Sequence, residues 1–227
     1  MSYSYYEVYT YTHRAFEGLG FPYGADEDAA FIITWLELYN LNGVHLLASN
    51  INKFDQKYDG VVDQMNSDNL INLKNKSSLM VAPGLIDYLK SKTKTTDNQI
   101  LVLENCSYPI FFIPVLANLL KKQIYTIVKI SNNIVCVMSE NKISISDKLL
   151  RNLEAQQSFS ISLAKKNNFF NNLDINIDLT NKKESLSLGL DPKKKDWEKI
   201  LQIASRIYVP ESDESREKGA GGGDAND

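Results

Sequence analysis

IYTIVKISNNIVCVMSENKISIS, residues 124–146, contains three apolar runs interrupted by polar residues, and Ser131-Asn132-Asn133 separates the first two. Alternation with a period of two is typical of a strand that buries one face, and a short polar break between two such runs indicates a β-hairpin. Similar runs follow further along the chain. We predict a half-exposed, mostly antiparallel sheet, with strands at 124–130, 134–138, 142–146, 159–164 and 173–179.

Helical patterns precede this sheet. Ser4 and Glu7 have the spacing of a capping box, which predicts a helix from about Ser4 to Leu19 that glycines 18 and 20 end. After the turn 22–24 and an acidic first turn, residues 31–39 are apolar nearly all round, so we predict a second, buried helix that ends at Gly43.

The remaining segments give weaker signals. Residues 50–78 are predicted to form loops with short helical pieces, 83–89 a short helix and 90–98 an exposed linker. An apolar strand at 100–103, the loop 105–107 and a helix at 109–121 form a strand-loop-helix unit. A last helix is predicted to start at Asp191-Pro192 and to stop at Pro210. These elements predict an α+β fold, with an N-terminal helix pair, a mostly antiparallel sheet and a C-terminal amphipathic helix.

Length and composition predict one α+β domain over residues 1–210, followed by a glycine-rich tail at 211–227. Nothing approaches the ~18 consecutive apolar residues of a membrane helix, and no secretory signal is visible, so we expect a cytoplasmic protein without membrane contact. Cys106 and Cys136 lie in apolar runs and are expected to be buried free thiols. The net charge of −3 argues against a nucleic-acid partner.

Motifs for the common catalytic classes are missing from the sequence. The two histidines, His13 and His45, lie in different elements without zinc-ligand spacing, so no metal site is predicted. His45 fits a packed or partly exposed histidine better than a general base. The chain has no GxSxG, no phosphate loop and no GxGxxG, which removes support for common hydrolases, nucleotide triphosphatases and dinucleotide folds, and no cofactor is predicted.

The tail carries most of the candidate ligand-binding residues. Its glycines expose backbone amides that could hold an anion, although a glycine-rich terminus can also fray. Arg216 stands out because only 4 of the 25 basic residues are arginines. The candidates in the tail are Ser212, Ser215, Arg216, Gly219, Gly221, Gly222, Gly223, Asp224, Asn226 and Asp227.

Four candidates lie in the body of the chain: Arg14, Asp26, Glu27 and Asn105. For Asp26 and Glu27, the alternative is that acidic residues in a first helical turn complement the helix dipole. Asn105 and Ser107 follow a strand, where polar groups often meet a ligand, but the interpretation that they cap the next helix is favoured over a ligand site.

Two segments resemble a known bacterial family. They are Arg14-Ala-Phe-Glu-Gly18-Leu-Gly20-Phe-Pro-Tyr-Gly24-Ala-Asp-Glu27, with Trp35-Leu36 and Leu41-Asn-Gly43, and the C-terminal stretch from Tyr208 through Ser212, Ser215 and Arg216 to Gly219-Ala-Gly-Gly-Gly-Asp-Ala-Asn-Asp227. They are similar to the domain of unknown function numbered 3726. That resemblance implies an ordered tail and no known reaction.

The N-terminal helix pair also resembles the start of second-type malate and lactate dehydrogenases. The Ser-His-Gly catalytic stretch of those enzymes is absent, because Asn42-Gly43 stands in its place and His45 is displaced.

Two functional hypotheses follow from the sequence. In the first, the protein is a small-molecule metabolic enzyme or enzyme-like binder, with a polar pocket made by the tail, the turn 18–27 and the loop 105–107. In the second, it is a non-catalytic accessory or assembly subunit, and the tail and the N-terminal helices mediate contact with another copy of the chain or a partner subunit.

Overall fold

The computed structural model describes residues 2–62, 70–92, 98–119, 125–151, 158–164 and 173–208. Helices and a mixed, mostly antiparallel sheet make an α+β fold, as the sequence predicts. The α-helices are α1 (Tyr5–Gly18), α2 (Ala25–Leu38), α3 (Gly43–Phe54), α4 (Ser78–Lys92), α5 (Phe112–Leu119), α6 (Asp147–Arg151), α7 (Lys182–Leu188) and α8 (Lys194–Ala204), and short 3-10 turns lie at Pro109–Phe111, Leu179–Asn181 and Ser205–Ile207.

The described sheet has seven strands in the order β1-β2-β6-β3-β4-β5-β7. Its strands are β1 (Leu70–Asn72), β2 (Asn98–Glu104), β3 (Tyr125–Ile130), β4 (Asn133–Met138), β5 (Lys142–Ile145), β6 (Phe159–Ala164) and β7 (Ile175–Asp178). The hairpin β3–β4 turns at Ser131 and Asn132, and both have positive φ, as a two-residue turn of this hand requires. Only the pair β1–β2 is parallel among the described strands.

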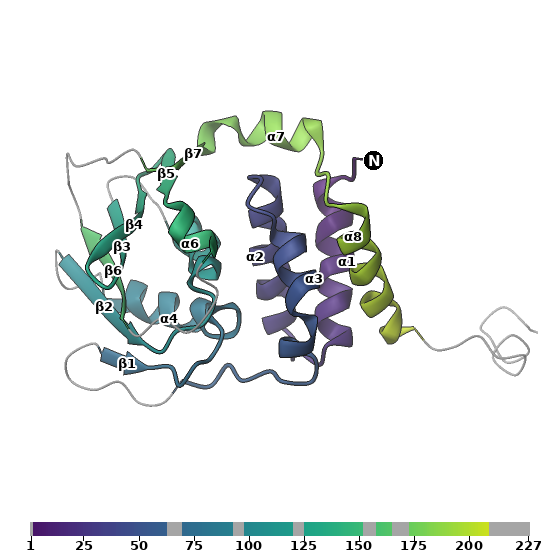
Figure 1. Ribbon diagram of the computed structural model, residues 1–227, viewed down its shortest axis with the longest axis horizontal. Coiled ribbons are helices and arrows are strands. Elements are labelled where there is room, and N and C mark those ends of the chain that lie inside the picture. Colours follow the sequence, from purple (N-terminus) through teal and green to yellow (C-terminus); the bar gives the residue numbers. More distant parts are fainter. Residues whose placement is uncertain are drawn as a thin grey trace, which may run out of the picture.

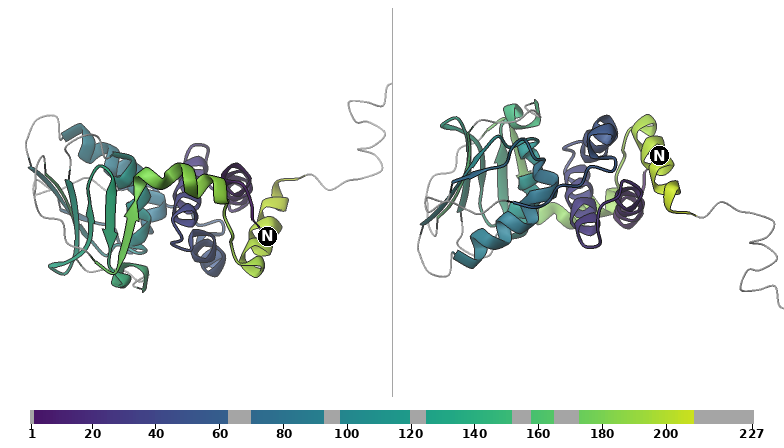
Figure 2. Two further views of the ribbon diagram at one scale, coloured as in Figure 1. Left: turned by 90° about the horizontal axis from the view of Figure 1, so that it is seen from above. Right: turned by 90° about the horizontal axis from the view of Figure 1, so that it is seen from below.

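Figures 1 and 2 show three parts in a row, with the sheet at one end, α4 and α6 in the middle, and a bundle of α1, α2, α3 and α8 at the other end. The bundle combines the two ends of the described chain: Tyr3 and Leu190 exchange two backbone hydrogen bonds of 2.8 Å, just before α1 and α8 begin. Segment α7 leads from β7 back across to the bundle.

Two glycines let helices of the bundle approach closely. A Cβ on Gly43 would lie 2.1 Å from the carbonyl oxygen of Ile33 in α2, and a Cβ on Gly18 would lie 2.6 Å from that of Ile203 in α8. Neither space could hold a side chain without moving backbone atoms. These contacts bring α3 against α2, and α8 against α1.

Several predicted boundaries were wrong. The second predicted helix is two helices, because Asn40 and Asn42 adopt left-handed conformations between α2 and α3, and Gly43 begins a helix instead of ending one. The predicted short helix at 83–89 is part of α4, with Pro83 inside, and the last helix begins at Lys194 instead of Asp191. Strand β1 and helices α6 and α7 were not predicted.

The core is apolar, and both cysteines are buried free thiols, as the sequence predicts. No helix in the described ranges has the length and apolar character needed to cross a bilayer.

Candidate functional site

Four lysines surround a pocket of about 440 Å3 beside the ends of β1 and β2. Lys53 and Lys57 come from the end of α3 and the turn after it, while Lys74 and Lys76 follow β1. We call this the lysine pocket; its other lining residues are Phe54, Asp59, Asn75, Ser77, Met80, Ser107 and Tyr108.

The loop after β1 and the loop after β2 lie beside these lysines and are hydrogen-bonded to each other. The amide of Asn75 donates to the carbonyl of Asn105 (2.9 Å), and the hydroxyl of Ser107 donates to the carbonyl of Asn75 (2.9 Å). Both loops therefore leave the carboxyl ends of the parallel pair side by side. In open sheets with parallel strands, that end is where ligands usually bind.

The charge in the lysine pocket is positive. Among the described residues, Asp59 is the one carboxylate that lines this pocket, and it pairs with Lys76 at 2.6 Å. The Nζ of Lys57 donates to the carbonyl of Asn52 (2.9 Å), and that of Lys53 lies 5.3 Å from the centre of the Tyr108 ring. Ser77 and Met80 place the start of α4 beside the pocket, where the helix dipole favours an anion.

A second, larger cavity of about 770 Å3 lies on the other side of Met80, between the start of α2 and α4. It is lined by three tyrosines, Tyr23, Tyr58 and Tyr88, and by apolar residues that include Ile71, Leu79, Val81 and Leu85. We call it the tyrosine pocket. The two pockets share Met80, and the segment 58–60 contributes to both.

Asp28 is the one charged residue in the described part of the chain that lines the tyrosine pocket. Its partial burial raises the pKa of its carboxyl, and the neighbouring carboxylates Asp87, Glu27 and Asp26 raise it further. The tyrosine pocket thus has an apolar wall and a negative edge, while the lysine pocket beside it is positive.

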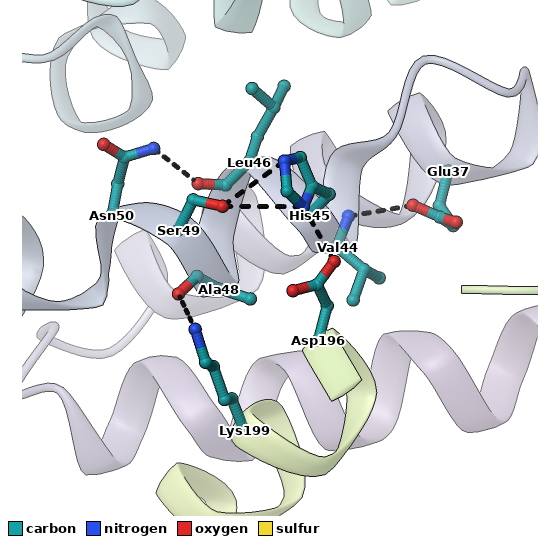
Figure 3. A network of polar contacts seen from close by, with 9 residues as sticks. All are labelled: Glu37, Val44, His45, Leu46, Ala48, Ser49, Asn50, Asp196 and Lys199. Atoms are coloured by element: carbon teal, nitrogen blue, oxygen red, sulfur yellow. Dashed lines mark hydrogen bonds and ion pairs between the residues drawn. The ribbon is translucent and has the colours of Figure 1, made fainter. Parts of the chain in front are cut away.

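A separate polar network joins α3 to α8 (Figure 3). His45 Nδ1 lies 2.7 Å from Asp196 Oδ2, and Ser49 Oγ lies 3.4 and 3.5 Å from the two ring nitrogens of His45. A serine activated by a histidine would approach one nitrogen in the ring plane, whereas nearly equal distances to both place this hydroxyl over the ring. We interpret the network as a structural contact that stabilises the packing of α8 on α3.

The body residues predicted as ligand-binding do not converge on one pocket. Arg14 Nη1 donates to the Tyr208 hydroxyl (2.6 Å), Glu27 is exposed, and Asp26 is buried beside His13, 3.2 Å away. Asn105 donates to the Asn72 side chain (3.1 Å), next to the lysine pocket. The ten tail candidates, from Ser212 to Asp227, lie outside the described residues.

The sequence offered a partial signal for the lysine pocket. Asn105 and Ser107 were singled out because they follow a strand, and Ser107 does line the pocket. The sequence does not indicate the lysines, because they lie in the segment 50–78, whose weak periodicity predicts no regular element. The short strand β1, which positions two of them, was not predicted either.

Comparison with solved structures defines the class of fold. The chain is similar to malate dehydrogenase from Pyrococcus horikoshii (TM-score 0.61, 10% identity, 92% of this chain and 96% of that chain). It is also similar to a putative malate/lactate dehydrogenase from E. coli (0.62, 8%, 93% and 96%) and to sulfolactate dehydrogenase from Methanocaldococcus jannaschii (0.57, 8%, 90% and 97%). The fold is that of these dehydrogenases, in agreement with the resemblance seen in the N-terminal helix pair.

The sequence itself matches a family whose function is not assigned. Residues 3–78 match the family described as "Protein of unknown function (DUF3726)", which confirms the resemblance seen at the N-terminus. No curated protein matches the chain. The matched segment contains α1, α2, α3 and the four lysines of the lysine pocket.

Proposed function

We propose that the protein binds a small organic anion, with a carboxylate or phosphate group, in the lysine pocket, as an enzyme or enzyme-like binder of small-molecule metabolism. The observation that carries this proposal is the convergence of four lysines and one aspartate on a pocket at the carboxyl ends of two parallel strands. A volume of about 440 Å3 is suited to a small metabolite.

The positive charge of the pocket contrasts with the rest of the chain. The protein has a formal net charge of −3, so a pocket with four lysines is a local exception that favours an anion over a neutral ligand. The named substrates of the structural neighbours, malate, lactate and sulfolactate, are small anions, which supports the same class of ligand for this chain.

The test is isothermal titration of the full-length protein with malate, lactate, sulfolactate and inorganic phosphate. The pocket variant carries Lys53→Gln and Lys74→Gln. A matched control carries Lys182→Gln and Lys183→Gln on α7, which removes the same charge from an exposed helix away from the pocket.

We expect at least one anion to bind, and the pocket variant to bind it about tenfold or more weakly, equivalent to about 1.4 kcal/mol. The control should bind like the unchanged protein. Equal losses in both variants would mean that overall charge and not the pocket attracts the anion, and absence of binding for every anion would overturn the proposal.

The predicted participation of residues 211–227 is a separate part of this proposal. Arg14 holds Tyr208, the last described residue, against α1. A chain that ends at Pro210 should bind the same anion more weakly if the tail contributes amides or Arg216 to the ligand. Unchanged affinity in the shortened chain would remove the tail from the site and leave the lysine pocket standing.

A further inference from the structure

Three side chains with metal-binding atoms meet where α1 turns into α2. His13 and Glu17 are four residues apart on α1, which places them on one face of the helix, and Asp26 lies in the first turn of α2. One ligand atom from each lies within 4.8 Å of the other two. We call these residues the hairpin cluster.

Asp26 is the distinctive member of the cluster because its side chain is only 1% exposed. Its Oδ1 accepts the backbone amide of Glu27 at 2.8 Å. Its Oδ2 is buried and accepts no hydrogen bond from the described residues, and it points toward His13 Nε2, 3.2 Å away. A buried carboxylate oxygen without a hydrogen bond is costly, so this atom requires a partner.

A hydrogen bond from His13 could serve Asp26, but it would not serve the third member of the cluster. Glu17 forms no ion pair or side-chain hydrogen bond with any described residue. Glu17 also lies in the last turn of α1, a turn without a basic residue, where the helix dipole disfavours a negative charge. A cation between the three side chains would serve both carboxylates.

We propose that the hairpin cluster binds one divalent transition-metal ion, with zinc and manganese as the probes of choice. One imidazole nitrogen and two carboxylate oxygens suit these ions better than magnesium or calcium, which prefer oxygen ligands alone. Ligand distances of about 2.0–2.2 Å place the ligand atoms about 3.4 Å apart around a tetrahedral ion. Pairs that now lie up to 4.8 Å apart must therefore approach by up to about 1.4 Å, which side-chain rotation can supply.

The exposed edge of the cluster leaves room for water. The His13 side chain is 27% exposed, so water can complete the coordination of an ion held by three protein ligands. The sequence did not predict this site because it combines a spacing of four on one helix with a third ligand nine residues later, in another helix.

The experiment uses the full chain, treated with EDTA and dialysed. Zinc or manganese is titrated by calorimetry, and bound metal is measured by mass spectrometry after dialysis. Melting temperature is recorded with and without metal, because an ion that binds the folded state raises it. The variants are Asp26→Asn and Glu17→Gln, with Glu27→Gln as the matched control in the same turn and His45→Gln as the control for the other histidine–carboxylate pair.

We expect one ion per chain with zinc or manganese and a higher melting temperature in its presence. Glu17→Gln and Asp26→Asn should each weaken binding at least tenfold, and both controls should keep the affinity of the unchanged protein. Because Asp26 is buried, Glu17→Gln decides the matter if Asp26→Asn does not fold. Binding that survives Glu17→Gln, or that is lost in His45→Gln, would overturn the proposal, as would the absence of a bound ion.

Discussion

Gly43 is the residue where α3 approaches α2 most closely. A Cβ at this position would lie 2.1 Å from a carbonyl oxygen and 2.9 Å from the Cβ of Leu36, so Gly43→Ala should force the two helices apart and reduce the free energy of unfolding by about 2 kcal/mol or more. Urea denaturation measures this change.

Gly84 provides the matched control for Gly43. It lies within α4, and a Cβ there would meet nothing within 4 Å. Gly84→Ala is therefore expected to leave stability unchanged or to increase it by up to about 1 kcal/mol, because alanine favours a helix. Similar losses for both variants would contradict the assignment of a special role to Gly43.

The two cysteines should be unreactive in the folded protein. Burial raises the pKa of both thiols far above the ordinary value, so neither Cys106 nor Cys136 forms a thiolate at neutral pH. A thiol reagent such as Ellman's should label neither residue in buffer and both in denaturant. Rapid labelling of the native protein would show that the loop after β2, which carries Cys106, or strand β4, which carries Cys136, opens easily.

Asp28 predicts a dependence of stability on pH. Since its folded-state pKa is raised above 3.8, the folded protein binds its proton more tightly than the unfolded chain does. Ionisation of Asp28 therefore lowers the free energy of unfolding as pH rises from the ordinary pKa of aspartate through the raised folded-state pKa. Asp28→Asn should stabilise the protein at pH 7, by less than about 1 kcal/mol because the side chain is exposed to solvent, and should change nothing near pH 3. Denaturation at both pH values tests the sign.

At the scale of elements, Trp197 is the aromatic residue through which α8 packs on α1 and on the segment before it. Trp197 is 2% exposed, and its ring lies 5.0 Å from that of Tyr3 and 5.8 Å from that of Tyr11. Trp197→Ala should cost about 3–5 kcal/mol in unfolding free energy, whereas Lys195→Ala on the exposed face should cost little. Circular dichroism during thermal unfolding measures both. A small loss for Trp197→Ala would mean that the aromatic contacts of Trp197 contribute little to the attachment of α8.

Elements with a strong local signal could be predicted from the sequence, and those fixed by distant partners could not. The β3–β4 hairpin follows from its own alternation and turn residues, and α1 from its cap, where Ser4 accepts the Glu7 amide as expected. In contrast, β1 has only three residues and exists because β2, about 30 residues later, supplies its hydrogen bonds. The break between α2 and α3 depends on left-handed asparagines, which a continuous apolar pattern conceals.

The same limit applied to the candidate site. Ser107 could be predicted because a strand, loop and helix follow one another in sequence, while Lys53 and Lys74 meet only after α3 and β1 have been placed in space. The hairpin cluster shows this too, since Asp26 reads as an ordinary first-turn acid until its burial beside His13 is known.

At the scale of the whole molecule, the lysine pocket should respond to ionic strength. The protein carries a net negative charge, so attraction of an anion depends on the local field of a few lysines, which salt screens over about 10 Å at 0.1 M. Anion affinity should therefore fall as sodium chloride is raised from 20 to 500 mM, and the Lys53→Gln, Lys74→Gln variant should show a flatter dependence. An affinity independent of salt would point to recognition by apolar or neutral polar contacts instead.

The backbone pairing of Tyr3 with Leu190 has a consequence during synthesis of the protein. Helix α1 packs on α8, whose residues leave the ribosome long after those of α1, because the whole sheet is translated between them. The face of α1 that packs on α8 must remain without its partner until most of the chain has emerged, although α2 can pack on α1, and α3 on α2, earlier. A nascent chain that stops before α8 should therefore bind a chaperone such as trigger factor at the N-terminal helices, and release it once Trp197 can reach Tyr3.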